Sequence, residues 1–212
     1  MLFVRRETFR EFLSLYPITS LIVFLNTIMM IVTILFGWFS NDEWIYSWGG
    51  LTKESVIDGE LYRLLTYSFL HSGMMHFLSN MVFTIIAAPA IEKLIGKMKF
   101  ITLFFFSIFM AALAVILIPT APYYLNVGES GFGYSLFGFY FYLVLFKKNV
   151  IDKESSKTIM VFIAVSWITT LIIPNISISA HIGGFIAGWL YAFFINKSLT
   201  RLKAMNSNSY YR

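Results

Sequence analysis

Two polar motifs interrupt the apolar stretches of this chain with residue types that suit nucleophilic catalysis. Ser130 lies between glycines in the motif Gly-Glu-Ser-Gly, at the start of an apolar run. His181 opens a second apolar run in the motif Ala-His-Ile-Gly-Gly. A serine hydroxyl becomes a good nucleophile when a neighbouring base accepts its proton, and histidine suits that task near neutral pH. Ser130 and His181 are therefore the candidate nucleophile and general base.

A third motif, His-Ser-Gly-Met-Met-His-Phe-Leu-Ser-Asn, contains His76 and Asn80. These two residues are four apart, so they share one face of a helix. Such donors suit the oxyanion that forms when a serine attacks a carbonyl group. Taken alone, a His–Asn pair in an apolar helix more often hydrogen-bonds between helices, and a serine among small residues more often serves helix packing. The combination of the motifs is what indicates a site.

The sequence offers no well-placed carboxylate to complete a catalytic triad. Five acidic residues fall in the expected first outer loop, and the others, except Glu129, fall on the expected cytoplasmic side. Adjacent positions on a helix point away from each other, so Glu129 beside Ser130 is poorly placed to orient His181. The residues therefore favour a Ser–His dyad.

The composition predicts a membrane protein. The chain has 212 residues, of which 58% are hydrophobic and 13% are charged, whereas a soluble domain carries about 25% charged residues. The absence of cysteine excludes disulfides, a thiol nucleophile and a thiolate metal site. A net charge of +5 is compatible with nucleic-acid binding, but the placement of the basic residues follows membrane topology, so we expect no nucleic-acid partner.

Six apolar segments predict an all-α fold, a bundle of six transmembrane helices. A helix needs ~20 residues to cross ~30 Å of hydrocarbon, and the last three segments are somewhat short for this. The segments are residues 18–39, 75–94, 101–118, 130–146, 158–173 and 180–195. We expect a cytoplasmic segment over residues 1–17, a membrane domain over residues 18–195 and a cytoplasmic tail over residues 196–212.

Lysine and arginine placement gives the orientation. Basic residues cluster before the first segment, in every second connection after it, and behind the sixth segment. Both termini should therefore be cytoplasmic, and every even-numbered helix should start on the outer side. His71, His76, Ser130 and His181 all lie near such starts. The four side chains should thus converge at similar depth near the outer surface.

Small residues recur at helical spacing in the fourth and sixth segments. They are Gly131, Ser135 and Gly138 in the fourth, and Ala180, Gly184 and Gly188 in the sixth. Small residues on facing helices allow the backbones to approach closely. Such an approach would bring the serine and the histidine within hydrogen-bonding reach.

Three histidines near one surface raise the alternative of a metal site. His71 and His76 are five apart and do not share a helical face, and the motif His-Glu-x-x-His does not occur. We therefore expect no metal and no other cofactor. A proton relay or transporter would need ionisable groups near the middle of the segments, and the sequence has none there.

Together the motifs resemble the signatures of the rhomboid family of intramembrane serine proteases. Those signatures are His-x-x-x-Asn on the second helix, Gly-x-Ser-Gly at the start of the fourth and Ala-His-x-x-Gly-x-x-x-Gly on the sixth. All three occur here in that order, within about residues 60–195. The resemblance implies a compact six-helix core whose fourth helix begins below the membrane surface.

The resemblance also implies roles for individual residues. Ser130 would be the nucleophile and His181 the general base, while His76, Asn80 and the backbone N–H of Ser130 would form the oxyanion hole. Tyr134 matches the family tyrosine that stacks on the catalytic histidine. That stacking would orient the histidine in place of a carboxylate.

Two positions depart from the family pattern. Tyr62-Arg63 stands where the family usually has Trp-Arg in the first outer loop, and we expect the pair to anchor that loop. Glu129 stands where the family mostly has a small or apolar residue. A carboxylate there could repel the developing oxyanion or favour the protonated form of His181, but we expect its carboxyl group to face a water-filled cavity.

The expected activity is cleavage of single-span or polytopic membrane proteins near their outer ends, through an acyl-enzyme. The alternative is a catalytically impaired rhomboid-like protein that binds membrane clients without cutting them. The expected partners are these substrates and the lipid bilayer, and the expected location is the cell membrane, as a multi-pass protein of a bacterial plasma membrane. The sequence does not indicate the oligomeric state.

Overall fold

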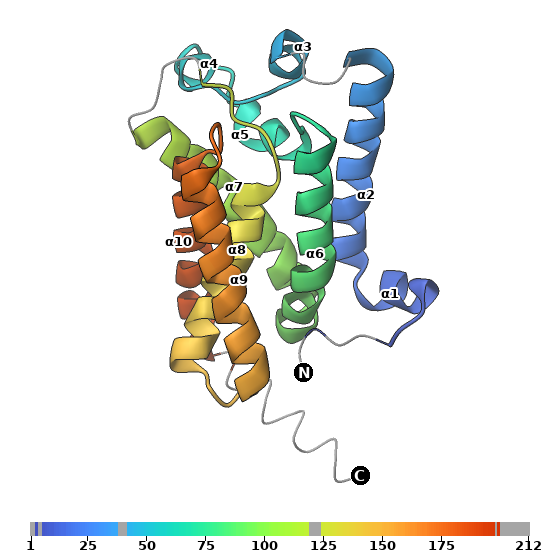
Figure 1. The fold of residues 1–212 in the computed structure, drawn as a ribbon, viewed down its shortest axis with the longest axis vertical. Coiled ribbons are helices and arrows are strands. Elements are labelled where there is room, and N and C mark those ends of the chain that lie inside the picture. Colours follow the sequence, from blue (N-terminus) through green and yellow to red (C-terminus); the bar gives the residue numbers. More distant parts are fainter. Residues whose placement is uncertain (1–2, 4–5, 38–41, 119–123, 198, 200–212) are drawn as a thin grey trace.

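The computed structural model describes residues 3, 6–37, 42–118, 124–197 and 199. This part of the chain is helical and holds no β-strand beyond one isolated bridge. The long helices stand side by side as a bundle (Figure 1). The structure confirms the expected all-α polytopic fold.

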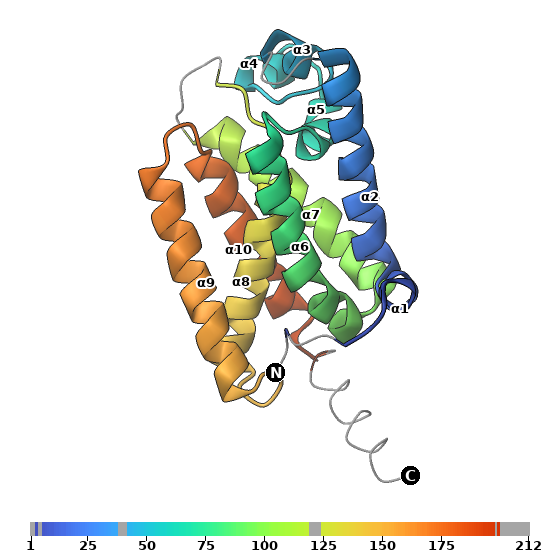
Figure 2. The same ribbon diagram turned by 45° about the vertical axis from the view of Figure 1, so that its right-hand side comes forward.

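The long helices of the described chain alternate in direction along the bundle (Figures 1 and 2). They are α2 (Pro17–Val32), α6 (Met74–Ile95), α7 (Lys97–Leu117), α8 (Ser130–Phe146), α9 (Lys153–Ile172) and α10 (Ile178–Phe194). The start of α2 and the end of α10 lie at one end of the bundle, in agreement with termini on one side of a membrane. The opposite end, where α6, α8 and α10 begin, is called the outer end below.

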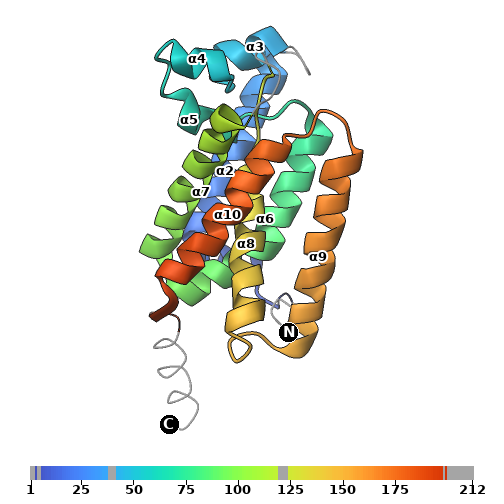
Figure 3. The same cartoon turned by 90° about the vertical axis from the view of Figure 1, so that its left-hand side faces the viewer.

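Short helices complete the fold. α1 precedes α2, a π-helical turn continues α2, and the remaining short helices gather at the outer end (Figure 3). They are α1 (Phe9–Leu15), the π-helix η1 (Thr33–Gly37), α3 (Asp42–Ser47), α4 (Lys53–Ile57), α5 (Arg63–Thr66) and the 3₁₀-helix η2 (Tyr67–Phe69). The connection between the first two predicted segments is therefore structured rather than a plain loop.

Helix length separates two groups of long helices. Four are long and apolar enough to cross a membrane, at Pro17–Phe36, Met74–Ile95, Lys97–Leu117 and Lys153–Ile172, whereas α8 and α10 are shorter. The prediction that the fifth segment is short was wrong, because α9 already begins at Lys153. Asp152 caps its N-terminus by accepting a hydrogen bond from the backbone N–H of Ser155.

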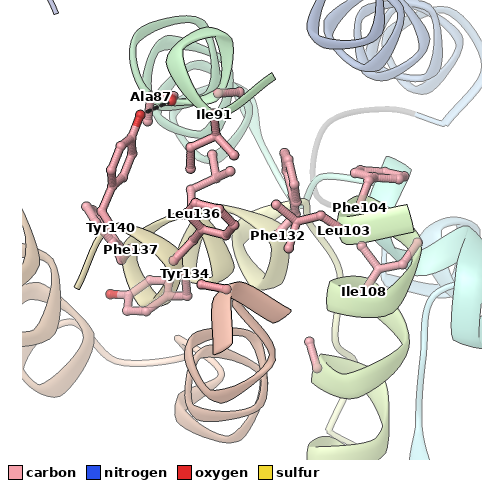
Figure 4. Packing of buried hydrophobic residues seen from close by; sticks show 14 of the residues in the cluster. Ala87, Ile91, Leu103, Phe104, Ile108, Phe132, Tyr134, Leu136, Phe137 and Tyr140 are labelled. Atoms are coloured by element: carbon pink, nitrogen blue, oxygen red, sulfur yellow. Dashed lines mark hydrogen bonds between the residues drawn. The ribbon is translucent and has the colours of Figure 1, made fainter. Parts of the chain in front are cut away.

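α8 lies at the centre of the bundle, with α6, α7, α9 and α10 around it (Figure 3). Phe132 and Leu136 of α8 are fully buried. In Figure 4, Phe132 points toward α7 and Leu136 toward Ile91 of α6, and the ring centroids of Phe132 and Phe104 are 5.0 Å apart. Neighbouring helices therefore surround α8 on several sides, and the chain descends into the bundle before its first turn (Figure 1).

The backbones of α8 and α10 touch. A Cβ atom on Gly184 would lie 2.0 Å from the carbonyl oxygen of Gly131, and one on Gly188 would lie 1.8 Å from that of Ser135. A Cβ atom on Gly138 would lie 1.9 Å from a backbone oxygen of α10. No side chain fits at these three positions, so glycine is what allows the helices to pack at this distance.

The carboxylate of Glu92 links α6 to the start of α2 by hydrogen bonds. Glu92 of α6 is 2% exposed. It accepts hydrogen bonds from the backbone N–H groups of Ile18 and Thr19, at 2.9 and 2.8 Å, and from the Thr19 hydroxyl at 2.7 Å. Glu92 thus caps the first turn of α2 from a neighbouring helix, where a carboxylate meets free N–H groups and the positive end of the helix dipole.

Candidate active site

Ser130 and His181 lie opposite each other where α8 meets α10. Ser130 is the first residue of α8, and His181 lies in the first turn of α10. The distance between Ser130 Oγ and His181 Nε2 is 3.0 Å, within hydrogen-bonding range. His181 is 5% exposed, whereas Ser130 is partly accessible. The close backbone contact of α8 and α10 therefore joins a serine and a histidine that are far apart in the sequence.

The imidazole ring of His181 is held on two further sides. Its Nδ1 atom lies 2.9 Å from the hydroxyl oxygen of Thr170 on α9. The ring of Tyr134, one turn after Ser130, stacks on it with centroids 3.8 Å apart and an interplanar angle of 12°. Neutral groups thus orient this ring, at a position where a triad would have a carboxylate.

His76 and Asn80 lie on α6 close to the backbone just before Ser130. A Cβ atom on Gly128 would lie 2.6 Å from His76 Nε2 and 3.3 Å from Asn80 Nδ2. Gly128 has a φ of +107°, which L residues rarely adopt. Glycine is therefore required here twice, for its conformation and for the approach of the two polar side chains.

His71 holds the side chain of Asn80. His71 precedes α6, is 2% exposed, and its Nε2 atom lies 3.0 Å from Asn80 Nδ2. Burial, with a smaller contribution from the nearby His76, lowers the pKa of His71 from 6.5 to about 3. The imidazole of His71 is therefore neutral at physiological pH. The amide nitrogen of Asn80 is the donor, so His71 Nε2 accepts and Nδ1 carries the proton.

The three histidines have separate hydrogen-bond partners, although the rings of His71 and His76 pack edge to face with centroids 5.1 Å apart. His71 contacts Asn80, His181 contacts Ser130, and the Nδ1 atom of His76 lies 3.2 Å from the Ser72 hydroxyl. Among the residues that the structure describes, no group of three or more histidine, aspartate or glutamate side chains could hold a metal ion.

The segment that leads into α8 is fixed by backbone hydrogen bonds. Leu51 and Asn126 exchange two of them, at 3.0 and 2.8 Å, and the N–H of Gly128 donates to the carbonyl of Tyr67 at 2.9 Å. The buried Tyr67 in turn donates its hydroxyl hydrogen to the carbonyl of Ile108 on α7 at 2.7 Å. The position of the α8 N-terminus is thus set by the short helices of the outer end.

Arg63 anchors the first outer loop through several contacts, whereas Tyr62 contributes less to that anchoring. Arg63 is 3% exposed and donates to the carbonyl oxygens of Tyr46 and Gly50, the latter at 2.8 Å. Its guanidinium group lies 4.1 Å from the ring centroid of Tyr46 and 5.3 Å from that of Tyr62. Tyr62 itself is 52% exposed. The aromatic partner nearest to the arginine therefore comes from α3.

The carboxyl group of Glu129 does not face a water-filled cavity, contrary to the expectation from the sequence. The residue is 1% exposed, and the Thr84 hydroxyl of α6 donates to its Oε1 atom at 3.0 Å. Within the described residues its Oε2 atom has no hydrogen-bond partner. The reason for the difference is that α6 offers a hydroxyl donor beside the start of α8, so the side chain turns toward that helix.

A family model for the rhomboid domain matches residues 58–198, more than half of the chain. The chain belongs to the rhomboid family. It is 33% identical over 193 residues to YdcA of Bacillus subtilis, which is named as a candidate rhomboid protease, and the match covers 91% of this chain and 95% of YdcA.

Two further rhomboid relatives differ in length and in the activity that their names state. Rhomboid protease GluP of Bacillus subtilis is 25% identical over 174 residues, and the match spans 82% of this chain but 34% of GluP. RHOMBOID-like protein 8 of Arabidopsis thaliana, which is named inactive, is 29% identical over 143 residues, or 66% of this chain and 40% of that protein. The family therefore includes members with and without activity.

Membership in the rhomboid family supports an intramembrane protease embedded as a multi-pass membrane protein. Rhomboid proteases act on membrane-protein substrates within the bilayer. Because one relative is named inactive, the activity of this member has to be argued from its own residues.

Sequence reasoning missed two residues that contact the candidate site, Thr170 and Thr84, and it expected His71 near the site without giving it a role. Thr170 follows another threonine, Thr169, and the sequence does not indicate which of the two faces the bundle. Thr84 lies one helical turn after Asn80, on the same face of α6, and this spacing is a signal that could have identified it.

Proposed function

We propose that this rhomboid is an intramembrane serine endopeptidase that cleaves transmembrane segments near the outer face through the dyad of Ser130 and His181. The observation that carries the proposal is the 3.0 Å contact between Ser130 Oγ and His181 Nε2. The Tyr134 ring stacked on the histidine gives further support, because it restricts the imidazole to the orientation in which Nε2 faces the hydroxyl. Membership in the rhomboid family, which includes proteases, supports peptide-bond hydrolysis as the reaction.

The reaction begins when Ser130 Oγ attacks the carbonyl carbon of a peptide bond and His181 Nε2 accepts the hydroxyl proton. The tetrahedral intermediate carries a negative charge on the former carbonyl oxygen. His181 then donates the proton to the leaving amine, which breaks the C–N bond and leaves an acyl-enzyme ester on Ser130. A water molecule, deprotonated by His181, hydrolyses this ester and restores the serine.

The oxyanion is stabilised by donors at the start of α8 and on α6. Ser130 is the first residue of its helix, so its N–H has no partner within α8, and the helix dipole favours negative charge at that point. His76 and Asn80 contribute further donors, in keeping with their position beside Gly128. Fixed donors of this kind need no reorganisation during the reaction.

The substrates are transmembrane segments of single-span or polytopic proteins, cut near their outer ends. A peptide carbonyl within a helix is hydrogen-bonded and shielded, so the segment has to unwind locally before Ser130 can attack it. Small or helix-destabilising residues around the cut lower the free energy of this unwinding. The relationship to YdcA of Bacillus subtilis supports a bacterial plasma membrane as the location.

Proteolysis in liposomes tests the proposal against the alternative of an impaired client-binding protein. Wild type, Ser130→Ala and the control Ser156→Ala are reconstituted with a labelled single-span substrate whose outer end is rich in small residues. Ser156 is a partly accessible serine near the start of α9, and its hydroxyl donates to the carbonyl of Asp152. We expect cleavage by wild type and by the control, and none by Ser130→Ala. Equal cleavage by Ser130→Ala would exclude Ser130 as the nucleophile, and a folded wild type that binds the segment uncut would support the alternative.

A further inference from the structure

Thr170 is a buried hydroxyl on a helix that otherwise presents mainly apolar side chains to its surroundings. It is 2% exposed and belongs to the inward stripe of α9 that includes Ile159 and Ile163. The preceding residue, Thr169, is exposed and bonds only to the carbonyl of Val165 in its own helix, at 2.9 Å. The two threonines are thus chemically identical, but only Thr170 reaches the candidate site.

The hydroxyl hydrogen of Thr170 has an acceptor within α9. Thr170 Oγ1 lies 2.9 Å from the carbonyl oxygen of Ser166, four residues earlier, in the usual geometry of a threonine hydroxyl that donates back along its helix. The Tyr134 hydroxyl oxygen lies 2.7 Å from the same carbonyl oxygen and also contacts Thr170 Oγ1, where one of the two hydroxyls donates to the other. Two arrangements satisfy these contacts: Tyr134 donates to Thr170, which donates to the carbonyl, or Thr170 donates to Tyr134, which donates to the carbonyl. In both arrangements the hydroxyl hydrogen of Thr170 is used within this group of contacts.

Either arrangement leaves a lone pair of Thr170 Oγ1 to face His181 Nδ1, 2.9 Å away. A neutral imidazole has one donor nitrogen and one acceptor nitrogen, and the hydrogen bond of the first determines the role of the second. With Nδ1 as the donor, the lone pair of Nε2 faces Ser130 Oγ at 3.0 Å. The opposite tautomer would direct an N–H at the serine and leave no base for its proton.

We propose that Thr170 is the positioning residue of the dyad, accepting a hydrogen bond from His181 Nδ1–H and so selecting the tautomer in which Nε2 is the base. The inference rests on the proposed function for its effect on rate, whereas the tautomer itself is independent of any activity. This role also makes α9 part of the site, because one hydrogen bond from this helix determines which nitrogen of His181 acts as the base.

Three variants in liposomes test the kinetic consequence. Thr170→Val keeps the shape but removes the acceptor, Thr170→Ser restores a hydroxyl, and Thr169→Val removes a threonine hydroxyl from the exposed face of the same helix. We expect Thr170→Val to lower kcat about tenfold with little change in KM, while Thr170→Ser and Thr169→Val stay near wild type. Equal loss in Thr169→Val, or no loss in Thr170→Val, would overturn the inference.

Nitrogen NMR of the His181 imidazole gives the second measurement, on protein labelled with ¹⁵N-histidine in lipid vesicles and assigned by comparison with His181→Gln. The chemical shifts of the two ring nitrogens report which one carries the proton. We expect Nδ1–H in wild type and in Ser130→Ala, and an increased Nε2–H population in Thr170→Val. An Nε2–H tautomer in wild type would overturn the inference. If wild type cleaves nothing, the proposed function fails, and the NMR result still decides the role of Thr170.

Discussion

The helix pair α8 and α10 differs from the peripheral helices α2 and α9 in the contacts that hold it in place. Between α8 and α10 the backbones touch, at Gly184 and Gly188 among others. α2 and α9 pack through apolar side chains such as Ile22 and Ile163, and single polar groups add hydrogen bonds there: Glu92 between α6 and α2, and the Thr170 hydroxyl between α9 and the site. The proposed nucleophile and base both lie on the tightly packed pair. The comparison predicts that the proposed dyad depends on dense packing, and that α2 and α9 adjust it through single polar contacts.

The largest expected effect comes from breaking the packed pair. Gly188→Val would place a Cβ atom 1.8 Å from the Ser135 carbonyl oxygen, so α8 and α10 have to separate. We expect a loss of about 3 kcal/mol or more in the free energy of unfolding, together with loss of proteolysis. Denaturant titration in detergent micelles measures the first and the liposome assay the second. Ala164→Val, on the exposed face of α9, is the control, and an equal loss there would contradict the comparison.

Removing the Glu92 contacts that hold α2 should reduce stability less and leave the proposed dyad intact. Glu92→Ala leaves the N–H groups of Ile18 and Thr19 without their carboxylate. We expect the free energy of unfolding to fall by about 2 kcal/mol, with cleavage retained at low temperature because α8 and α10 are unchanged. Glu92→Gln, which keeps one acceptor oxygen, should lose less. A variant that is stable but inactive would show that α2 acts directly on the site.

Acidic pH should lower the free energy of unfolding through protonation of His71 at the outer end. Its pKa is lowered from 6.5 to about 3 in the folded protein, so the unfolded chain binds the extra proton first as pH falls. The contribution of neutral His71 is complete above pH 6.5 and is lost progressively toward pH 3. One pH unit below 6.5 the loss is about 1.4 kcal/mol. His71→Gln should reduce the pH dependence of the unfolding midpoint, and an unchanged dependence would contradict this role.

The smallest effect is expected where α6 meets the start of α8. Thr84→Val removes the donor to Glu129 Oε1 and should cost about 1 kcal/mol of stability. Glu129→Gln keeps an acceptor oxygen at the same place and should cost less, with proteolysis close to wild type in both. Unfolding titrations of the two variants provide the measurement. A larger loss in Glu129→Gln than in Thr84→Val would show that the acid itself matters beyond this hydrogen bond.

The sequence predicted the helical segments and the approach of Ser130 to His181, because both predictions depend on local patterns. Apolar runs, basic connections and small residues at helical spacing are visible in one dimension. The start of α9 at Lys153 was missed because its first turn is polar and is stabilised by the cap at Asp152. Residues 41–67 were interpreted as a connection, because the helices that the structure describes between Asp42 and Phe69 are too short to show a periodic pattern.

Apart from the close approach of α8 and α10, contacts between individual side chains of different helices could not be predicted from the sequence. Whether Thr169 or Thr170 faces His181 depends on the rotation of α9, which its packing on α8 decides. Glu129 was expected to meet water, but its position depends on Thr84, a residue of another helix. Arg63 was anticipated as an anchor, whereas its closest aromatic neighbour, Tyr46, comes from α3 and not from the preceding position.

The most direct test of the dyad is the reaction of the protein with a fluorophosphonate probe in lipid vesicles, with the adduct located by peptide mass spectrometry. The probe needs an activated serine but no knowledge of the natural substrate. We predict one adduct, on Ser130, in wild type, none in Ser130→Ala, and a much slower reaction in His181→Gln because the 3.0 Å contact with the base is removed. An adduct on another residue, or a folded wild type that does not react, would contradict the dyad.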